Sequence, residues 1–194
     1  MKQEIILRLT SVILFSTLLL QGCSKSSGSD SNSTGNYLTA NVNGKAWSAN
    51  VNSSLNNSPT IAILTNANGV DILYVIGIRS ENKDSSAIAV IFPKNITLNK
   101  ASAFNAAQYL EGAYISGTAS DPGKYYGYNT TPATGGSGTV TVTLLDQSAN
   151  IVEGTFSGTF GSQQGRPAVQ ITDGKFHCPY TTDATKLPKS NIKF

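Results

Sequence analysis

Most of the chain consists of short segments in which apolar and polar residues alternate, a pattern that predicts β-strands. The clearest case is the pair Thr139–Leu145 and Ile151–Phe160, where Val140, Val142 and Leu144 alternate with threonines. A period of two turns one set of side chains toward the core and the other toward solvent. We therefore expect an antiparallel hairpin with one buried face and one wet face.

One face of the second strand of this hairpin combines large apolar side chains with glycines. Val152, Phe156 and Phe160 share that face with Gly154 and Gly158. Phenylalanines fill a core, and a glycine beside them permits a close backbone approach or a bulge. This face is expected to point inward.

Two other runs, Asp71–Arg79 and Ser86–Phe92, are apolar on both faces. This is expected of central strands in a sandwich or barrel. Pro93 should end the second run because proline cannot donate to a strand ladder. Helical periodicity is weak throughout the chain, and Ala101–Leu110 is the only candidate.

Turn dipeptides divide the remaining segments. Asn43-Gly44 predicts a hairpin between Tyr37–Val42 and Lys45–Val51, since both of its residues tolerate positive φ. Asp173-Gly174 predicts a last hairpin in the same way. Further strands are expected at Thr60–Thr65, Glu111–Gly117, Lys124–Asn129, Val169–Thr172 and Lys175–Cys178. The fold class is therefore all-β, an antiparallel β-sandwich or barrel of about eight to ten strands over residues 37–180.

The N-terminal segment differs from the rest. Lys2 and Arg8 precede the uncharged run Leu9–Leu20, which is shorter than the roughly 20 residues that a spanning helix needs. A charged start and a short apolar run are typical of a signal peptide. Leu20-Gln21-Gly22-Cys23 resembles the cleavage and lipidation site of bacterial lipoproteins, and the alternative is an ordinary signal peptide in which Cys23 has no role.

The resemblance to lipoproteins implies a location for the protein in the cell envelope. Residues 1–22 would be removed, and Cys23 would anchor the chain in the membrane through its acyl groups, of which two or more suffice for stable binding. Ser24 in place of aspartate implies an outer membrane lipoprotein, facing either the periplasm or the cell surface. The polar stretch Ser24–Asn36 would then be a flexible tether that spans about 20 Å on average. Residues 181–194 form a polar C-terminal tail.

Charge and cysteine content exclude several classes of protein. The formal net charge is +3 without a basic cluster, so nothing indicates a nucleic-acid partner. Of the two cysteines, lipidation would use Cys23, which leaves Cys178 unpaired and the fold without a disulfide. Trp47 is expected in the core.

His177 and Cys178 invite a metal-binding or catalytic interpretation because they are adjacent. His177 is the only histidine, so one chain holds no two-histidine zinc site. Neighbours in a strand point to opposite faces, and Cys178 shares parity with Phe176. We expect a buried, inert thiol, and we predict no metal, no cofactor and no catalytic residue.

A group of tyrosines is the candidate ligand-binding site. Tyr114, Tyr125, Tyr126 and Tyr128 lie on neighbouring expected strands. Aromatic faces on a β-scaffold stack on sugar rings or pack against a protein partner. The alternative is structural, since tyrosine has a high propensity for strands.

Three stretches resemble a family of small secreted bacterial lipoproteins with an all-β domain of unknown function. They are Leu38–Trp47 (LTANVNGKAW), Gly154–Phe160 (GTFSGTF) and Ile171–Phe176 (ITDGKF). The resemblance implies an all-β domain outside the cytoplasm and brings no catalytic residues with it.

Three functions remain open. The first is a lipid-anchored, non-catalytic binding or structural module with a glycan or a surface protein as partner. The second is a carbohydrate-active hydrolase that uses paired carboxylates, although the acids fall mainly at turns and strand ends, where turn chemistry accounts for them. The third is a lipocalin-like carrier, which requires a barrel with an internal cavity.

Overall fold

The computed structural model describes residues 35–50, 59–81, 84–118, 125–162 and 164–182. The all-β fold class is confirmed, since these residues form eleven strands and two 3₁₀ turns. None of the described helices is long and apolar enough to cross a membrane. The elements are β1 (Tyr37–Val42), β2 (Lys45–Ser48), β3 (Thr60–Ala67), β4 (Val70–Glu81), β5 (Asp84–Pro93), β6 (Ser102–Ala103), η2 (Ala106–Gln108), β7 (Glu111–Thr118), β8 (Tyr125–Asn129), η3 (Pro132–Thr134), β9 (Ser137–Asp146), β10 (Ile151–Ser162) and β11 (Val169–Thr181).

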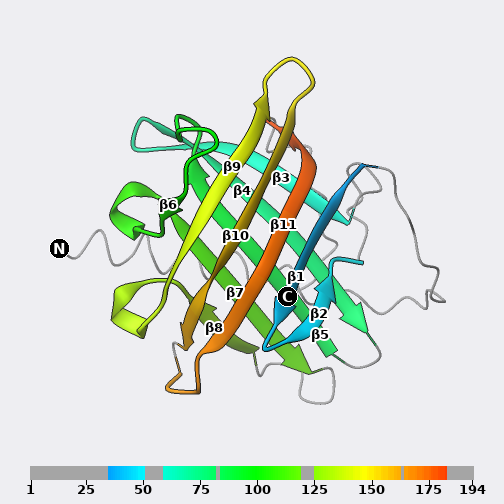
Figure 1. Cartoon of the computed structure of the whole chain (residues 1–194), viewed down its shortest axis with the longest axis vertical. Helices are drawn as coiled ribbons and strands as arrows, with labels where there is room; N and C mark the ends of the chain where they lie inside the picture. The colour runs from blue at the N-terminus through cyan, green and yellow to red at the C-terminus, as the bar shows by residue number, and fades with distance from the viewer. Residues whose placement is uncertain (1–34, 51–58, 82–83, 119–124, 163, 183–194) are drawn as a thin grey trace, which may run out of the picture.

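The strands form two layers that cross each other (Figure 1). The front layer has the order β2-β1-β11-β10-β9-β6, and the back layer has the order β3-β4-β5-β7-β8. Two short pairings join the layers, so that hydrogen bonding continues from one to the other: Gly161 and Ser162 of β10 pair with β8, and Tyr180 and Thr181 of β11 pair with β3. The β11–β3 pairing is parallel, which corrects the expectation of a purely antiparallel fold.

The core lies between the two layers. Phe92, Phe160 and Phe176 are among its largest fully buried side chains, and Phe92 and Phe176 stack with ring centroids 6.0 Å apart. Phe156 lies 6.4 Å from Phe176, so rings from β10, β11 and β5 meet in one cluster. The inward face predicted for β10 is confirmed, because Val152, Phe156 and Phe160 are buried there.

Two local predictions from glycine are also confirmed. Asn43 and Gly44 have φ values of 49° and 75°, the left-handed pair that a tight hairpin between β1 and β2 requires. Gly154 lets β10 approach the core closely, since a Cβ there would lie 2.5 Å from the Phe176 ring and 2.5 Å from the Thr141 carbonyl oxygen.

The alternation predicted for β9 fails at its end. Val140 and Val142 are buried, but Leu144 is 38% exposed. Val142 pairs with Gly154 while Leu144 pairs with Glu153, so Thr143 is an extra residue in the ladder. A bulge of one residue reverses the faces that follow it, and Leu145 packs against the core in place of Leu144.

The hairpin predicted at Asp173-Gly174 is wrong. β11 runs unbroken from Val169 to Thr181 and pairs with β1 on one side and β10 on the other. Thr39 of β1 pairs with Lys175 and Asn41 pairs with Thr172, so Asp173 and Gly174 form a bulge in which Asp173 has a φ of 53°. A dipeptide that tolerates positive φ suits a bulge as well as a turn.

The strand count also exceeds the expected eight to ten, partly because of a two-residue strand. Ser102–Ala103 pairs with β9 as β6, and the 3₁₀ turn Ala106–Gln108 follows it. The weak helical pattern of Ala101–Leu110 is thus divided between a strand fragment and a single turn. Pairs this short leave no periodic signal in a sequence.

Candidate functional site

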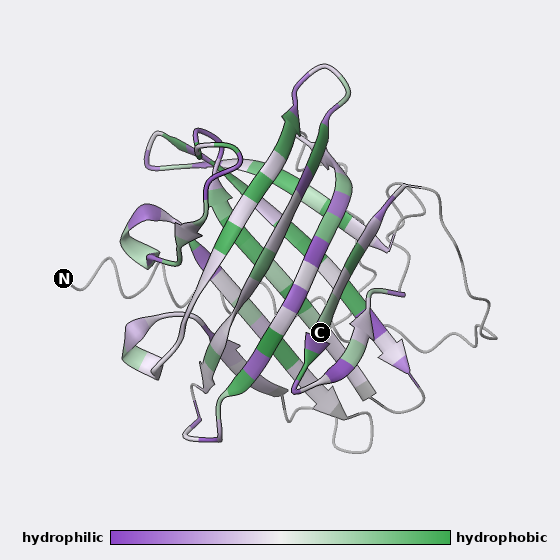
Figure 2. Cartoon of the chain, viewed as in Figure 1, coloured by the Kyte–Doolittle hydropathy of each residue, from purple (hydrophilic) through white to green (hydrophobic). Residues whose placement is uncertain are grey.

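The outward face of the front layer is polar across four neighbouring strands. Figure 2 shows hydrophilic bands along β11, where this face is most strongly polar. The polar residues on this face include Thr39, Asn41, Thr139, Thr141, Glu153, Thr155, Ser157, Thr159, Gln170, Thr172, Lys175 and His177. Hydroxyl groups predominate, as the wet face predicted for β9 and β10 requires.

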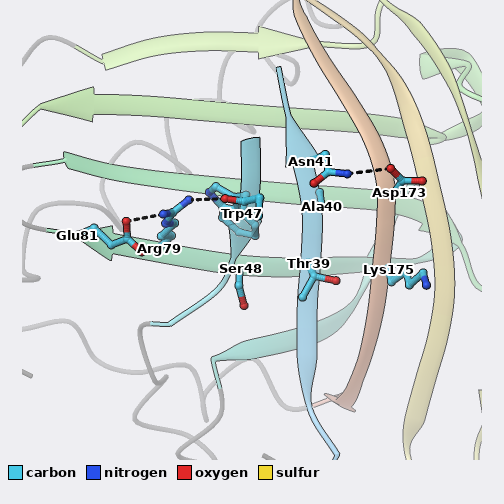
Figure 3. Close-up of a pocket in the computed structure, with 10 residues that line it drawn as sticks. Thr39, Ala40, Asn41, Trp47, Ser48, Arg79, Glu81, Asp173 and Lys175 are labelled. Carbon is cyan, nitrogen blue, oxygen red and sulfur yellow. Dashed lines mark hydrogen bonds and ion pairs between the residues drawn. The ribbon is translucent and has the colours of Figure 1, made fainter. Parts of the chain in front are cut away.

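Two shallow hollows lie on either side of the β11 bulge. The first, of about 400 Å³, is lined by residues of β1, β2, β4 and β11 (Figure 3). The second, of about 280 Å³, is lined by residues of β9, β10 and β11. Asp173 and Lys175 line both hollows, so the two adjoin at the bulge. We call the two hollows together the trough.

The bulge residues have defined partners. The Asn41 side-chain amide donates a hydrogen bond of 2.8 Å to Asp173 Oδ2, and the Thr172 hydroxyl donates one of 3.2 Å to the same oxygen. Lys175 is exposed and has no ion-pair partner among the described residues. Gly174 forms part of the floor, where a Cβ would lie 2.6 Å from the Phe156 carbonyl oxygen.

The rim of the first hollow is fixed by contacts between β2 and the back layer. Arg79 of β4 donates a 3.1 Å hydrogen bond to the Ala46 carbonyl oxygen and forms an ion pair with Glu81 (Figure 3). Trp47 is buried, as predicted, and its indole Nε1 donates a 2.8 Å hydrogen bond to the Ser86 hydroxyl. These contacts hold the short edge strand β2 in place beside β1.

An aromatic platform continues the trough along β1 and β11. Tyr37 pairs with His177 two residues beyond the Thr39–Lys175 pair, on the same face, and their rings stack with centroids 6.0 Å apart and an interplanar angle of 23°. Tyr37 is 37% exposed. His177 Nδ1 lies 3.3 Å from Glu153 Oε2 on β10, which fixes the imidazole from its other side.

The structure separates His177 from Cys178 as the strand pattern predicted. Cys178 is fully buried in the core, whereas His177 lies on the outward face. Burial raises the pKa of the Cys178 thiol far above its ordinary value, so the thiol stays protonated and unreactive. Among the described residues, no group of three or more histidine, cysteine and acidic side chains lies close enough to hold a metal ion.

Most of the tyrosines singled out as a ligand-binding group lie away from the trough. Tyr128 is buried in the core, and Tyr114 packs against it at 5.8 Å with a pKa that burial raises. Tyr126 lies beneath the Arg166 guanidinium, 3.3 Å from its ring centroid. The Tyr125 side chain lies outside the described residues. These positions favour the structural alternative for Tyr114 and Tyr128, and ligand binding by the group stays a prediction.

The acidic residues mostly have local partners. Asp71 accepts a 2.8 Å hydrogen bond from Asn66 in the β3–β4 turn. Asp146 accepts hydrogen bonds from the Ser148 hydroxyl and from the backbone of Ser148 and Ala149, which lower the pKa of its carboxyl. Glu81 and Glu153 contact Arg79 and His177. Turn and strand partners thus account for these carboxylates.

Some predicted positions fall outside the described residues, among them the signal peptide (residues 1–22), the lipidation site Cys23, the tether up to residue 34, and residues 183–194 of the tail. Within the described part, parity alone could have identified Tyr37 as an outward aromatic residue, because it alternates with Leu38 and Ala40 and matches Thr39 and Asn41. The trough itself carried no such signal, since its bulge resembles a turn in the sequence.

The side chains that line the trough are suited to binding a polar ligand. The trough offers hydroxyl groups, the Asn41 amide and one ammonium group without an ion-pair partner among the described residues, and the Tyr37 ring lies beyond it on the same face. Compared with known proteins, the chain matched no family model, no curated protein and no solved structure.

Proposed function

We propose that this chain is a lipid-anchored, non-catalytic binding module of the bacterial outer membrane and that it binds a glycan along the outward face of its front layer. The observation that carries the proposal is the trough, in which both hollows share the residues of one β-bulge. Bulges re-aim side chains and occur often next to functional sites.

The chemistry of the trough supports a glycan. Sugars present many hydroxyl groups, and Thr141, Thr155 and Ser157 offer matching donors and acceptors on the second hollow. A sugar ring also has an apolar face that stacks on an aromatic ring, and Tyr37 is exposed on the same surface. A shallow, open and polar surface suits a long chain that lies along it better than a small molecule that must be enclosed.

The packing between the layers gives less support to the carrier alternative. A carrier needs an internal cavity of ligand size, whereas Phe92, Phe156, Phe160 and Phe176 fill the space where the layers meet. The hydrolase alternative needs two carboxylates that flank one bond. Asp173 is the only acid among the described residues that line the second hollow, and Asn41 already engages it. The first hollow has both Asp173 and Glu81, but Glu81 is paired with Arg79.

Glycan binding is tested with substitutions that remove hydroxyl groups and keep side-chain shape. Thr141→Val and Thr155→Val should each weaken binding to a polysaccharide panel about fivefold, the effect of one lost hydrogen bond. Thr143→Val is the matched control, because Thr143 is exposed on β9 and lines neither hollow. Affinity electrophoresis measures all three. Binding that is absent throughout the panel, or equal in all variants, would contradict the proposal.

The anchor is tested separately by fatty-acid labelling in growing bacteria. The wild-type chain should incorporate labelled palmitate and partition into detergent, and Cys23→Ala should incorporate none. Cys178→Ser is the control, because a buried thiol is not a lipidation site and this variant should label like the wild type. Equal labelling of Cys23→Ala would show that the lipoprotein hypothesis is wrong.

A further inference from the structure

The centre of the trough, where the two hollows adjoin at β11, lies in the interior of its sheet, and this limits how a ligand can be held there. β11 is paired with β1 on one side and β10 on the other, and β10 is paired in turn with β9. A peptide that binds by strand addition needs a free sheet edge. Recognition at β11 and β10 therefore depends on side chains, which favours a ligand rich in its own polar groups.

The charged side chains on this surface differ in the partners that they contact. Asp173 accepts hydrogen bonds from Asn41 and Thr172, Glu81 contacts Arg79, and Glu153 contacts His177. Lys175 lines both hollows and has no such contact within the described residues. At its centre the trough therefore presents the Lys175 ammonium, without an ion-pair partner among the described residues, next to the Asp173 carboxylate, which accepts hydrogen bonds from Asn41 and Thr172.

From this arrangement we infer that the trough selects an acidic glycan, a polysaccharide whose sugar rings carry carboxylates. The inference rests on the proposed function and names the class of its ligand. The Lys175 ammonium binds a ligand carboxylate where the hollows adjoin. The hydroxyls of Thr141, Thr155 and Ser157 bind sugar hydroxyls in the second hollow, and the Tyr37 ring stacks on a neighbouring sugar.

Position explains why Lys175 serves this role. Lys175 pairs with Thr39 on β1 and with Thr155 on β10, so its cross-strand neighbours are hydroxyl residues. The nearby Asp173 carboxylate on β11 accepts hydrogen bonds from Asn41 and Thr172. The bulge at Asp173 and Gly174 precedes it and opens the surface on both sides of β11. A carboxylate at this point meets one cation and several hydrogen-bond donors.

The experiment compares two forms of one polymer, polygalacturonate and its fully methyl-esterified form, which differ only in the carboxylate. The full-length lipoprotein is solubilised in a neutral detergent and its affinity for each polymer is measured by biolayer interferometry. Polygalacturonate should bind about fivefold tighter than its ester, the effect of one exposed ion pair. The advantage should shrink as salt is raised from low to physiological concentration.

Variants assign the effect to Lys175. Lys175→Gln should bind polygalacturonate as weakly as the ester, whereas Lys175→Arg should keep the preference because it keeps the charge. Lys100→Gln is the matched control, since Lys100 is exposed and lines neither hollow. Unchanged thermal unfolding in all three variants shows that folding is intact, as expected for exposed side chains.

Each outcome decides between the two proposals. Equal affinity for both polymers, with loss in Thr155→Val, overturns the acidic preference and leaves glycan binding standing. A preference for polygalacturonate that persists in Lys175→Gln overturns the role of Lys175. No binding of either polymer, together with no binding across the polysaccharide panel that tests the proposed function, overturns both the inference and the proposed function.

Discussion

The outward face of β10 carries Thr155, Ser157 and Thr159, whereas the outward face of β4 carries Ile72, Ile76 and Ile78. In Figure 2 hydrophobic bands recur along the strands of the back layer, whereas hydrophilic bands recur along β11. Ala87 and Ile115 are buried on the outward side of the back layer and form a small cluster with Ile78. The front layer buries one face and the back layer buries residues on both.

Because of this difference, we expect the outward face of the back layer to contribute to stability and the outward face of the front layer to ligand binding. Residues on both faces of β4 and β5 are withdrawn from water, so substitutions on either face should cost folding free energy. On β10 and β11 the large buried side chains point inward, and the outward side chains around the trough are available to a ligand. We expect the two outward faces to respond very differently to the same change.

The largest effect should come from a charge placed on the back layer. Ile76→Asp puts a carboxylate at a site that is 8% exposed, and it should destabilise the protein by more than about 3 kcal/mol or prevent folding. Thr155→Asp makes the matched change on the front layer and should cost less than about 0.5 kcal/mol. Urea denaturation measures both. Equal costs would show that the two outward faces do not differ as described.

The bulge at the centre of the front layer should be the next most sensitive point. Gly174→Ala forces a Cβ against the Phe156 backbone and ring, with contacts of 2.6 and 2.7 Å, and should cost roughly 2 kcal/mol. It should also weaken glycan binding, because Gly174 and Phe156 line the second hollow. Thr172→Ala is the control at an exposed neighbour. A Gly174→Ala variant with wild-type stability would show that the bulge can shift without cost.

A smaller effect that depends on pH should come from Cys178. Burial raises the pKa of this thiol, so the folded state holds its proton while the unfolded thiol loses it above about pH 8.5. The thiol's contribution is therefore complete below that pH and falls by about 1.4 kcal/mol per unit as pH rises above it. Cys178→Ser should cost about 1–3 kcal/mol at pH 7.

The stabilities of the wild type and of Cys178→Ser should therefore converge as the pH rises. Urea midpoints at pH 7, 8, 9 and 10 follow the difference between wild type and Cys178→Ser. Taking the difference removes contributions common to both chains, including that of Tyr114, whose pKa burial also raises. A difference that stays constant across this range would contradict the buried, protonated thiol.

The smallest effect is expected at the contact between Glu153 and His177 on the outward face. Glu153→Gln removes the carboxylate beside His177, where the two side chains are 43% and 24% exposed. Exposed pairs contribute about 0–1 kcal/mol, so the urea midpoint should hardly change. A loss comparable to that of Gly174→Ala would mean that this part of the front face is needed for folding.

The sequence by itself determined the fold class and much of the inward set of side chains. Alternation placed Val152, Phe156 and Phe160 in the core, and Asn43-Gly44 specified the first hairpin. These predictions hold because the information is local: a period of two fixes the face, and tolerance of positive φ fixes a turn. The sequence also separated Cys178 from His177 for the same reason.

Only the tertiary structure decided that Asp173 and Gly174 form a bulge and not a hairpin turn. The same dipeptide suits a hairpin turn and a bulge, and the choice depends on β1 and β10, which are more than ten residues away and pair with both sides of β11. That pairing continues the strand across Asp173 and opens the trough around Lys175. The extra residue at Thr143 likewise exposes Leu144, because register between strands is set by the whole sheet and not by one segment.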